Sequence, residues 1–278
     1  MIELQRHLVR VARAGMRRVR PDPEPEVLVV SYPKCGRTWL RVLIGKALCD
    51  LFGVDQRELL ATFELSREAG LRPTRFVHDG VGGVAGIPWY EQDRDKSRFS
   101  DKRVVLMVRD PRDVMVSSYF QATKRMRAYQ GSISGFIRDE CYGVRTVLAM
   151  YRGWQESQQV PVEFLLVRYE DLHADPGAAL RRVLAVMGVG ACDDAVIESA
   201  VRHGEFGNMR VMERSGRFDR KLRPGDATDG ESYKVRRGVV GGFADYLGAE
   251  DIAYVERAIV EAGDPFGFAQ RRDAGSEP

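Results

Sequence analysis

Apolar and polar positions along the chain form short apolar runs that alternate with longer segments of helical spacing. The nearly continuous apolar runs predict strands buried on both faces of a sheet, over 27–31 (VLVVS), 103–108 (RVVLMV) and 162–167 (VEFLLV). Apolar residues that recur every three or four positions follow each run. Strands alternating with helices indicate βαβ units, so we expect a three-layer α/β fold with a central, mainly parallel sheet flanked by helices.

The expected helices follow the strands. The first begins near Trp39 and carries apolar residues to Leu51, and the second, over 113–124, has Pro111 near its start, where a missing N–H costs nothing. Further helical segments are predicted over 133–158, 176–187 and 249–262. Residues 210–235 are polar and lack a period, which predicts a mobile loop within the domain.

The ends of the chain differ from its body. Residues 1–20 hold six Arg and one Glu, and their weak apolar side predicts a solvated helix that caps the domain, with a membrane-surface or partner-docking arm as the alternative. We interpret 1–25 as a basic arm with a proline linker and 270–278 as a frayed tail. The whole chain, 1–278, is expected to form one domain.

Composition excludes several classes of protein. Hydrophobic residues make up 44% and charged residues 30%, which excludes disorder for most of the chain. The net charge is +3, and residues 1–20 contribute +5 of it, so the remaining residues sum to −2 and argue against a nucleic-acid binder. No apolar stretch is long enough to span a bilayer, and four widely spaced cysteines predict neither zinc nor a disulfide framework. We expect a cytoplasmic protein with no integral membrane segment.

The segment SYPKCGRTW, from Ser31 to Trp39, lies between the first strand and its helix. Backbone N–H groups and the helix dipole make such a turn suitable for a phosphate. Gly36 allows close approach, Lys34 supplies a charge and Thr38 a hydroxyl. The Walker A pattern GxxxxGK[ST] is absent, so ATP or GTP hydrolysis has no specific support. The alternative is an ordinary turn with a solvated lysine.

A second segment, RDPRDVMVSSY, opens the helix that follows the 103–108 strand. Arg109 stands at the carboxyl end of this strand, and Ser117 follows eight residues later on the helix. A guanidinium fork and a hydroxyl in these places are able to close on one phosphate. The alternative is an N-capped helix with surface arginines.

Together the two segments closely resemble the donor-binding motifs of sulfotransferases that use 3′-phosphoadenosine 5′-phosphosulfate (PAPS). The first is similar to the 5′-phosphosulfate loop YPKSGTTW, with Cys35 for Ser and Arg37 for Thr or Ser, and the second to the 3′-phosphate motif RxPxDVxVSxY. This resemblance implies a P-loop-like fold. It also implies PAPS binding by Lys34, Cys35, Gly36, Arg37, Thr38, Trp39, Arg109 and Ser117.

Three weaker matches follow in the order of the family and extend the resemblance over about residues 27–245. Tyr169 begins a YEDL element, Phe206 and Met209 match FxxM, and 236–238 (RRG) with Gly241 match RKGxxG. The resemblance implies that Tyr169 reaches the adenine, that Phe206 and Met209 lie near it, and that Arg236, Arg237 and Gly238 bind the 3′-phosphate. Departures from the family pattern are Glu205 for Ser, Arg237 for Lys and Phe243 for Trp.

His78, in RFVHDG, lies in the interval where the family places its catalytic histidine. Phe76 stands where the family often has a lysine. The resemblance implies that His78 accepts the proton of the acceptor, which a histidine with an ordinary pKa of about 6.5 is able to do near neutral pH. It further implies that Lys34 stabilises the leaving oxygen and that Ser117 bonds Lys34 until the acceptor arrives. No metal is needed.

The sequence therefore predicts transfer of a sulfuryl group from PAPS to a hydroxyl or amine of a small-molecule acceptor, with release of adenosine 3′,5′-bisphosphate (PAP). A homodimer is left open. One alternative is a P-loop-type kinase. The other is a nucleotide-binding protein that has lost its catalytic activity, which is supported by the departures from the family pattern at Cys35, Arg37 and Phe76. Several aromatic residues are candidates for the acceptor pocket, although core packing is the preferred interpretation for each: Trp89, Tyr90, Phe99, Phe136, Tyr142, Tyr151 and Trp154.

Overall fold

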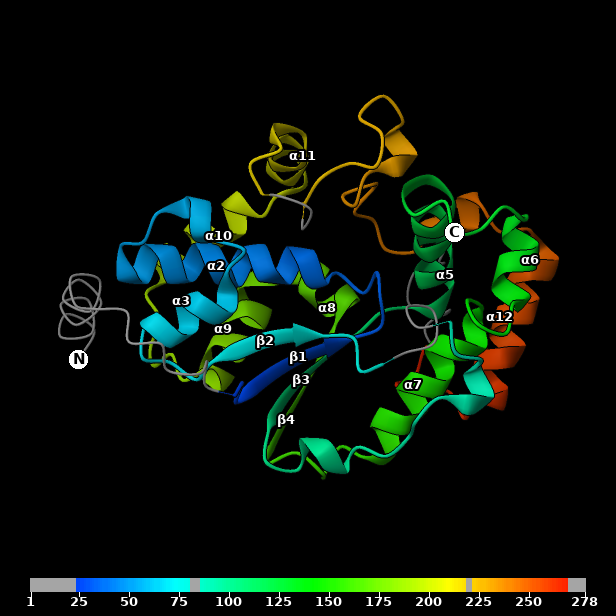
Figure 1. Ribbon diagram of the computed structural model, residues 1–278, viewed down its shortest axis with the longest axis horizontal. Coiled ribbons are helices and arrows are strands. Elements are labelled where there is room, and N and C mark those ends of the chain that lie inside the picture. Colours follow the sequence, from blue (N-terminus) through cyan, green and yellow to red (C-terminus); the bar gives the residue numbers. More distant parts are fainter. Residues whose placement is uncertain (1–23, 81–85, 219–221, 270–278) are drawn as a thin grey trace, which may run out of the picture.

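The computed structural model describes residues 24–80, 86–218 and 222–269 (Figure 1). Its centre is a four-stranded parallel sheet in the order β2-β1-β3-β4. The strands are β1 (Val27–Ser31), β2 (Thr74–Val77), β3 (Arg103–Val108) and β4 (Glu163–Arg168). Three of them agree with the predicted strands, whereas β2 was not predicted. The expected α/β class with a parallel sheet is confirmed.

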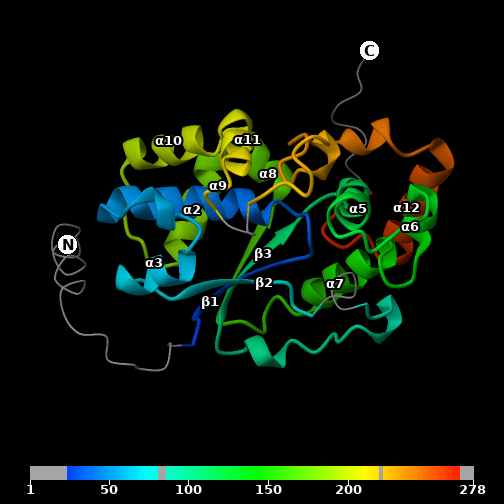
Figure 2. The ribbon, with the colours of Figure 1, turned by 45° about the horizontal axis from the view of Figure 1, so that its top comes forward.

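Helices cover both faces of the sheet. Figures 1 and 2 show α2, α3, α9 and α10 together on one side and α5, α6, α7 and α12 gathered on the other. The helices are α2 (Arg37–Phe52), α3 (Thr62–Glu68), α5 (Pro111–Phe120), α6 (Ile133–Arg138), α7 (Val144–Glu156), α8 (Tyr169–Ala174), α9 (Pro176–Val186), α10 (Asp194–His203), α11 (Phe206–Ser215) and α12 (Ala249–Glu261). A π-helical turn, η4 (Gln121–Arg125), extends α5.

Local chemistry explains where these elements begin. All five residues of β1 are buried, as the continuous apolar run requires of a strand with both faces covered. Asp110 caps α5 by accepting from the Arg112 amide, and Pro111 occupies the first helical position. The α5 helix therefore begins directly after β3, with Arg109 held at the junction.

Two predictions about helices were wrong. The segment 133–158 forms two helices, because the Asp139 carboxylate accepts from the Cys141 and Tyr142 amides and stabilises a turn in place of the helix. At Gly143 a Cβ would lie 2.3 Å from the Asp139 carbonyl oxygen, so the tight turn needs glycine. Residues 210–215 belong to α11 and not to a loop. The expected N-terminal arm up to residue 23 and the 270–278 tail lie outside the described residues.

The topology places the two predicted phosphate-binding turns side by side. In the register of the central pair, Ser31 of β1 stands opposite Met107 of β3. The chain leaves β1 toward one edge of the sheet, and leaves β3 toward the other. This is the point at which open α/β sheets bind ligands, outside the carboxyl ends of the strands.

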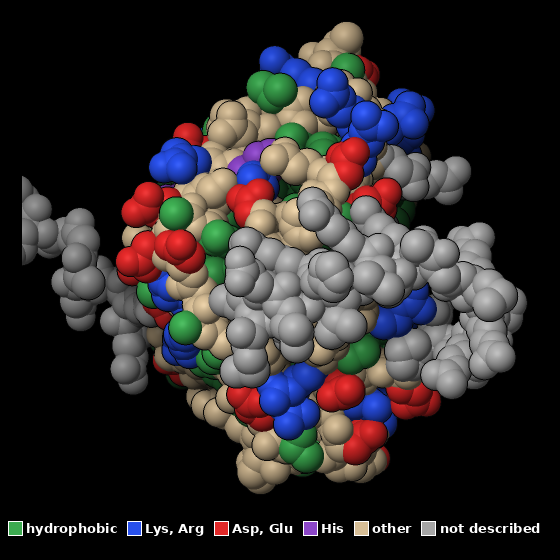
Figure 3. All heavy atoms as spheres, turned by 90° about the vertical axis from the view of Figure 1, so that its left-hand side faces the viewer, with side chains coloured by type: hydrophobic (Ala, Val, Ile, Leu, Met, Phe, Trp, Pro, Cys, Tyr) green, Lys and Arg blue, Asp and Glu red, His purple; other side chains and the backbone are tan. Residues whose placement is uncertain are grey.

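The surface seen in Figure 3 carries acidic and basic side chains interspersed over most of its described area. Large apolar side chains that are exposed include Phe206, Val239 and Val240. Within 24–80, 86–218 and 222–269, no helix combines the length and apolar character that crossing a bilayer requires.

Candidate active site

A cavity of about 500 Å³ opens beyond the carboxyl ends of β1, β3 and β4. Apart from Cys35, every residue predicted to bind the donor or to act in catalysis lines this cavity. The Cys35 side chain is completely buried in the core, with its Sγ 3.4 Å from the Tyr151 hydroxyl. Burial raises the pKa of the Cys35 thiol to about 12. The Cys35 side chain therefore forms no part of the cavity wall.

The loop between β1 and α2 adopts a backbone that specifically needs Gly36. Its φ is +88°, and a Cβ there would lie 2.6 Å from Cδ2 of Tyr169. Lys34 also has a positive φ, 72°, which is unusual for a lysine and is typical of strained functional turns. The loop is thus shaped to bring its backbone close to whatever fills the cavity.

Lys34 is the central cation of this loop. Its Nζ donates a hydrogen bond to Gln121 Oε1 at 3.4 Å, one turn beyond Ser117, and among the described residues no hydrogen bond joins Lys34 to Ser117. Burial is the main cause that lowers the pKa of Lys34 to about 7, and the charges of Arg125 and Lys234 add to it. An anion in the cavity would restore the positive charge of this ammonium.

Arg109 connects the two turns. Its Nη1 donates to the Lys34 carbonyl at 3.4 Å and its Nη2 to the Val239 carbonyl at 2.9 Å. The guanidinium lies 4.2 Å from the centre of the Tyr169 ring and 3.3 Å from the Asp113 carboxylate. Its Nε is buried without a hydrogen-bond partner in the described chain. The side chain is therefore fixed in the cavity wall with donor capacity unused.

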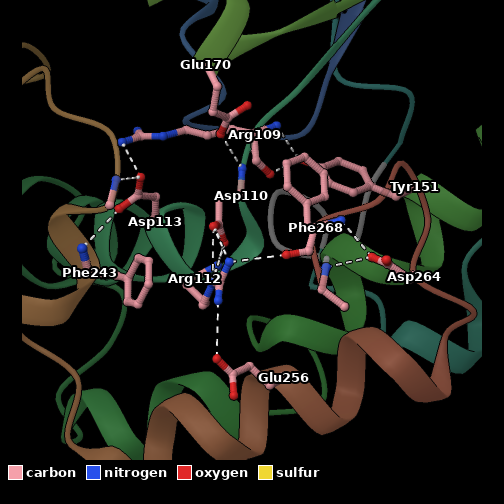
Figure 4. A network of polar contacts seen from close by, with 12 residues as sticks. Arg109, Asp110, Arg112, Asp113, Tyr151, Glu170, Phe243, Glu256, Asp264 and Phe268 are labelled. Carbon is pink, nitrogen blue, oxygen red and sulfur yellow. Dashed lines mark hydrogen bonds and ion pairs between the residues drawn. The ribbon is translucent and has the colours of Figure 1, made fainter. Parts of the chain in front are cut away.

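Asp113 holds Arg109 and the 241–243 backbone at the same time. Its two carboxylate oxygens accept from the Gly241 and Phe243 amides at 2.9 and 3.0 Å (Figure 4). Neighbouring Arg112 is paired with Asp110 at 2.6 Å and Glu256 at 3.2 Å, which ties the start of α5 to α12. These contacts join segments far apart in the sequence around one corner of the cavity.

The segment 236–238 contributes two further arginines to the wall. Arg236 donates to Tyr246 at 2.7 Å and Glu231 at 3.0 Å, and its Nε is buried without a described partner. Arg237 pairs with Asp245 at 2.5 Å near the surface. Gly238, with φ of +66°, packs so closely on Phe206 that a Cβ would lie 2.7 Å from the Phe206 ring. This corner is cationic and closed on one side by an aromatic ring.

Aromatic rings form the adjoining part of the cavity. Trp39 makes edge contacts with Tyr169 and His173, with ring centres 5.9 and 6.2 Å apart. Phe206 and Met209 of α11 line the same cavity, and Phe206 is 45% exposed. A slot with rings on its walls and a cationic corner beside it suits a flat heterocycle attached to a phosphate.

His78 lies at the end of β2, where the cavity meets a second, shallower hollow. Its Nδ1 is 3.0 Å from the Ser31 carbonyl oxygen, which only accepts, so Nδ1 carries the proton and Nε2 is the basic nitrogen. Burial, followed by the charge of Arg37, lowers the pKa of His78 to about 4. The imidazole is therefore neutral at physiological pH and able to accept a proton.

Sequence reasoning missed several residues of the cavity wall. Lys234 and Gln121 come from segments whose proximity to the loop depends on tertiary contacts. Met126 was missed as well. Phe136 and Tyr142 were named as pocket candidates but with core packing preferred; they are stacked with ring centres 5.7 Å apart and line the cavity. By contrast, Phe99, Tyr151 and Trp154 are core residues, as preferred from the sequence. Within the described residues, no group of three or more His, Cys, Asp or Glu side chains is arranged to hold a metal ion.

An α/β fold with two strand–turn–helix corners, an aromatic slot and a neutral histidine around one cavity fits a transferase that uses a nucleotide donor. A family model described as "Sulfotransferase domain" matches residues 94–266, well over half of the chain. The chain belongs to the sulfotransferase family.

Individual comparisons agree with this assignment. The chain is 27% identical to cytosolic sulfotransferase 17 of Arabidopsis thaliana, over 90% of this chain and 77% of that protein. It is 30% identical to sulfotransferase 4A1 of Mus musculus, over 66% of each chain. Its fold matches mouse sulfotransferase SULT7A1 complexed with PAP, with a TM-score of 0.60, 19% identity and coverage of 92% of this chain and 89% of the other. Retinol dehydratase in a complex with retinol and PAP gives a TM-score of 0.63 at 17% identity, over 87% of this chain and 82% of the other.

Proposed function

We propose that this sulfotransferase transfers the sulfuryl group of PAPS to a hydroxyl or amine of a small-molecule acceptor and releases PAP. The observation that carries the proposal is the single cavity in which the Lys34 loop and the Arg109 corner meet, with Arg109 Nη1 3.4 Å from the Lys34 carbonyl. One doubly phosphorylated nucleoside would contact both turns. The similar mouse enzyme was solved with PAP, which supports the same donor here.

The residues present fit such a donor. The buried Nε atoms of Arg109 and Arg236 retain unused donor capacity in the cationic corner, where Ser117 adds a hydroxyl and Gly238 its backbone. Trp39, Tyr169, Phe206 and Met209 would bind the adenine, and the loop from Lys34 to Thr38 would bind the phosphosulfate. Cys35 would contribute only its backbone N–H, since its side chain points into the core.

Bound PAPS supplies an activated sulfuryl group, and the chain supplies the acid–base and electrostatic chemistry. Nε2 of His78 accepts the proton from the acceptor oxygen or nitrogen as that atom attacks. The Lys34 ammonium and the loop N–H groups stabilise the negative charge that develops on the departing oxygen of PAP. Transfer of the sulfuryl group would break the bond between sulfur and the phosphate oxygen of the donor and form a bond between sulfur and the acceptor oxygen or nitrogen.

A two-part experiment tests this function. Calorimetry with PAP, ATP and GTP should give micromolar or tighter binding for PAP alone, because the second cationic corner matches the 3′-phosphate that the others lack. Labelled PAPS offered with a panel of phenols, alcohols and amines should then yield sulfated product. Preferential ATP binding, or PAP binding without transfer to any acceptor of a broad panel, would favour the kinase or the inactive nucleotide-binding protein.

The pKa of Lys34 predicts that PAP binds more tightly as pH falls toward 7. With a pKa of about 7 in the free protein, Lys34 has lost its proton in most molecules at higher pH, and binding of the anion requires its return. We expect the affinity for PAP to fall by up to about tenfold per pH unit between about pH 7 and 9. Calorimetry in buffers of different ionisation enthalpy will detect the proton uptake.

The matched control for this titration is Lys34→Arg, which keeps its charge over the whole range. Its affinity for PAP should vary less with pH, and only the titration of Lys234 should remain. Equal dissociation constants for the native protein at about pH 7 and 9 would contradict the assignment of Lys34 as the phosphosulfate cation.

A further inference from the structure

The hydroxyl of Tyr151 contacts both of the turns that the donor is proposed to bind. It accepts a hydrogen bond from the Arg109 amide and donates one to the Arg109 carbonyl, each at 2.8 Å (Figure 4). The same hydroxyl lies 3.4 Å from Cys35 Sγ. The side chains of Tyr151 and Cys35 are fully buried, and neither residue is among those that line the cavity. One buried hydroxyl therefore touches the turn after β1 and the turn after β3 from behind the cavity wall.

The sheet alone does not fix where these two turns lie. The register between β1 and β3 ends with Ser31 opposite Met107, and β3 itself ends at Val108. Arg109 follows that end, so its backbone N–H and C=O need partners outside the strand ladder, and leaving them unpaired away from water would be costly. The Tyr151 hydroxyl satisfies both groups. It thereby sets the position at which the chain leaves β3.

A count of donors and acceptors gives Cys35 a definite part in this contact. The hydroxyl gives its one proton to the Arg109 carbonyl and uses one lone pair for the Arg109 amide. Burial keeps the Cys35 thiol protonated, so the thiol donates to the second lone pair, which is nearer than the Pro33 carbonyl at 4.0 Å. Cys35 stands between Lys34 and Gly36, which both have a positive φ. Its buried side chain therefore anchors the most constrained part of the loop.

Tyr151 is itself held firmly in the core. It belongs to α7, and its ring centre lies 5.8 Å from that of Phe266 and 6.0 Å from that of Phe268. The segment that carries these rings is fixed in turn, because Asp264 accepts from the Phe268 amide at 2.6 Å and Arg112 donates to the Phe268 carbonyl at 3.3 Å (Figure 4). The hydroxyl is thus a fixed point on a part of the chain that contains neither turn.

A second link joins the turns on the cavity side. Arg109 Nη1 donates to the carbonyl of Lys34, the residue before Cys35. The backbone of Arg109 is held to the loop through Tyr151, and its side chain is held to the loop directly. A donor whose two anionic groups are attached to one ribose has them at a restricted separation. A site whose turns already stand at that separation loses less free energy on binding.

We propose, on the basis of the donor assignment above, that Tyr151 is a positioning residue for the donor and that Cys35 is the partner through which it holds the Lys34 loop. The pair fixes the spacing of the two turns before the donor arrives. Its contribution therefore belongs to ligands that reach both turns. Neither side chain touches the donor or takes part in the transfer.

Tyr151→Phe tests the proposal, because it removes the hydroxyl and keeps the ring beside Phe266 and Phe268. Calorimetry compares PAP, which reaches both turns, with adenosine 5′-monophosphate and adenosine 3′-monophosphate, which each reach one. We expect the variant to bind PAP at least tenfold more weakly and each monophosphate within about threefold of the native affinity. Equal losses for all three ligands would make the hydroxyl a general support of the fold. That result, or native affinity for PAP, overturns the proposal.

A double-mutant cycle measured with PAP alone tests the contact with Cys35. Cys35→Ala should weaken PAP binding in the native protein, because the loop loses its anchor. The same substitution should have little further effect in Tyr151→Phe, where the thiol has no hydroxyl to bond. Additive losses would show that the two side chains act separately and would overturn the pairing.

The matched control is Tyr233→Phe. Tyr233 is also buried, its hydroxyl donates to the Ala227 carbonyl at 3.0 Å, and it is not among the residues that line the cavity. This variant also loses a hydroxyl contact and should keep the native affinity for PAP. A loss as large as that in Tyr151→Phe would overturn the special role of Tyr151. Failure of the native protein to bind PAP would instead defeat the donor assignment, and is read before any variant is measured.

Discussion

Replacement of His78 by alanine is expected to lower kcat by about 10²- to 10⁴-fold while the affinity for PAP stays within about twofold. The size of the loss follows from removing the group that takes the proton of the acceptor. His78 is suited to this role because its Nδ1 proton is committed to the Ser31 carbonyl, which leaves Nε2 unprotonated. Steady-state kinetics with PAPS and calorimetry with PAP measure the two quantities.

His78→Asn separates proton transfer from positioning. The asparagine amide is able to donate to the Ser31 carbonyl in place of Nδ1, but it has no basic nitrogen. The asparagine variant should therefore be about as inactive as the alanine variant while remaining equally folded. Native turnover in either variant would remove His78 from the chemistry and leave it a structural role.

Replacement of Arg109 by methionine is expected to weaken PAP binding by about 100-fold or more. The guanidinium is the cation shared by the two turns, and a charge-assisted bidentate contact to a phosphate has no substitute in a thioether. The same change leaves the buried Asp113 carboxylate without its partner, which should destabilise the fold by about 3–5 kcal/mol. Calorimetry and denaturant unfolding measure the two effects.

A second substitution separates these effects. Adding Asp113→Asn to the Arg109→Met variant removes the unpaired charge, so stability should recover in part while PAP affinity stays low. Arg109→Lys keeps the charge without the planar fork and should fall between the native and methionine proteins in affinity. Native PAP affinity in the double variant would show that Arg109 serves the fold alone.

The central part of this fold was predictable because three of its strands have a clear hydrophobic pattern. The β1, β3 and β4 segments are nearly continuous apolar runs of five or six residues, too short for a typical helix and followed by turns, which favours strands. Strand β2 is only four residues long and carries an exposed arginine in its middle, so it lacks that signal. The helix α10 was not predicted either, although the sequence carries a helix signal there. Asp193 caps the segment, and Ile197 and Ala200 lie on its buried face.

Most of the predicted phosphate-binding residues came from two local motifs, each of which sets its own geometry. A strand, a tight turn and a helix fix the Lys34 loop and the Arg109 corner independently, and the parallel pairing of β1 and β3 then brings them together. Lys234, Gln121 and Tyr142 had no such local signature. Their places in the cavity depend on how α5, α6 and the 230–243 segment pack, and a single sequence does not specify this packing.

The contacts of the Asp113 carboxylate also limit which shortened or rearranged forms of the chain are able to bind the nucleotide. The Asp113 side chain holds the Arg109 guanidinium, from the first half of the chain, and the Gly241 and Phe243 amides, from its last fifth. A shorter polypeptide that keeps only the Lys34 loop and the Arg109 turn would therefore lose part of the nucleotide site. Truncation, circular permutation or domain grafting has to carry both pieces, or the retained arginine turns toward a partner other than phosphate.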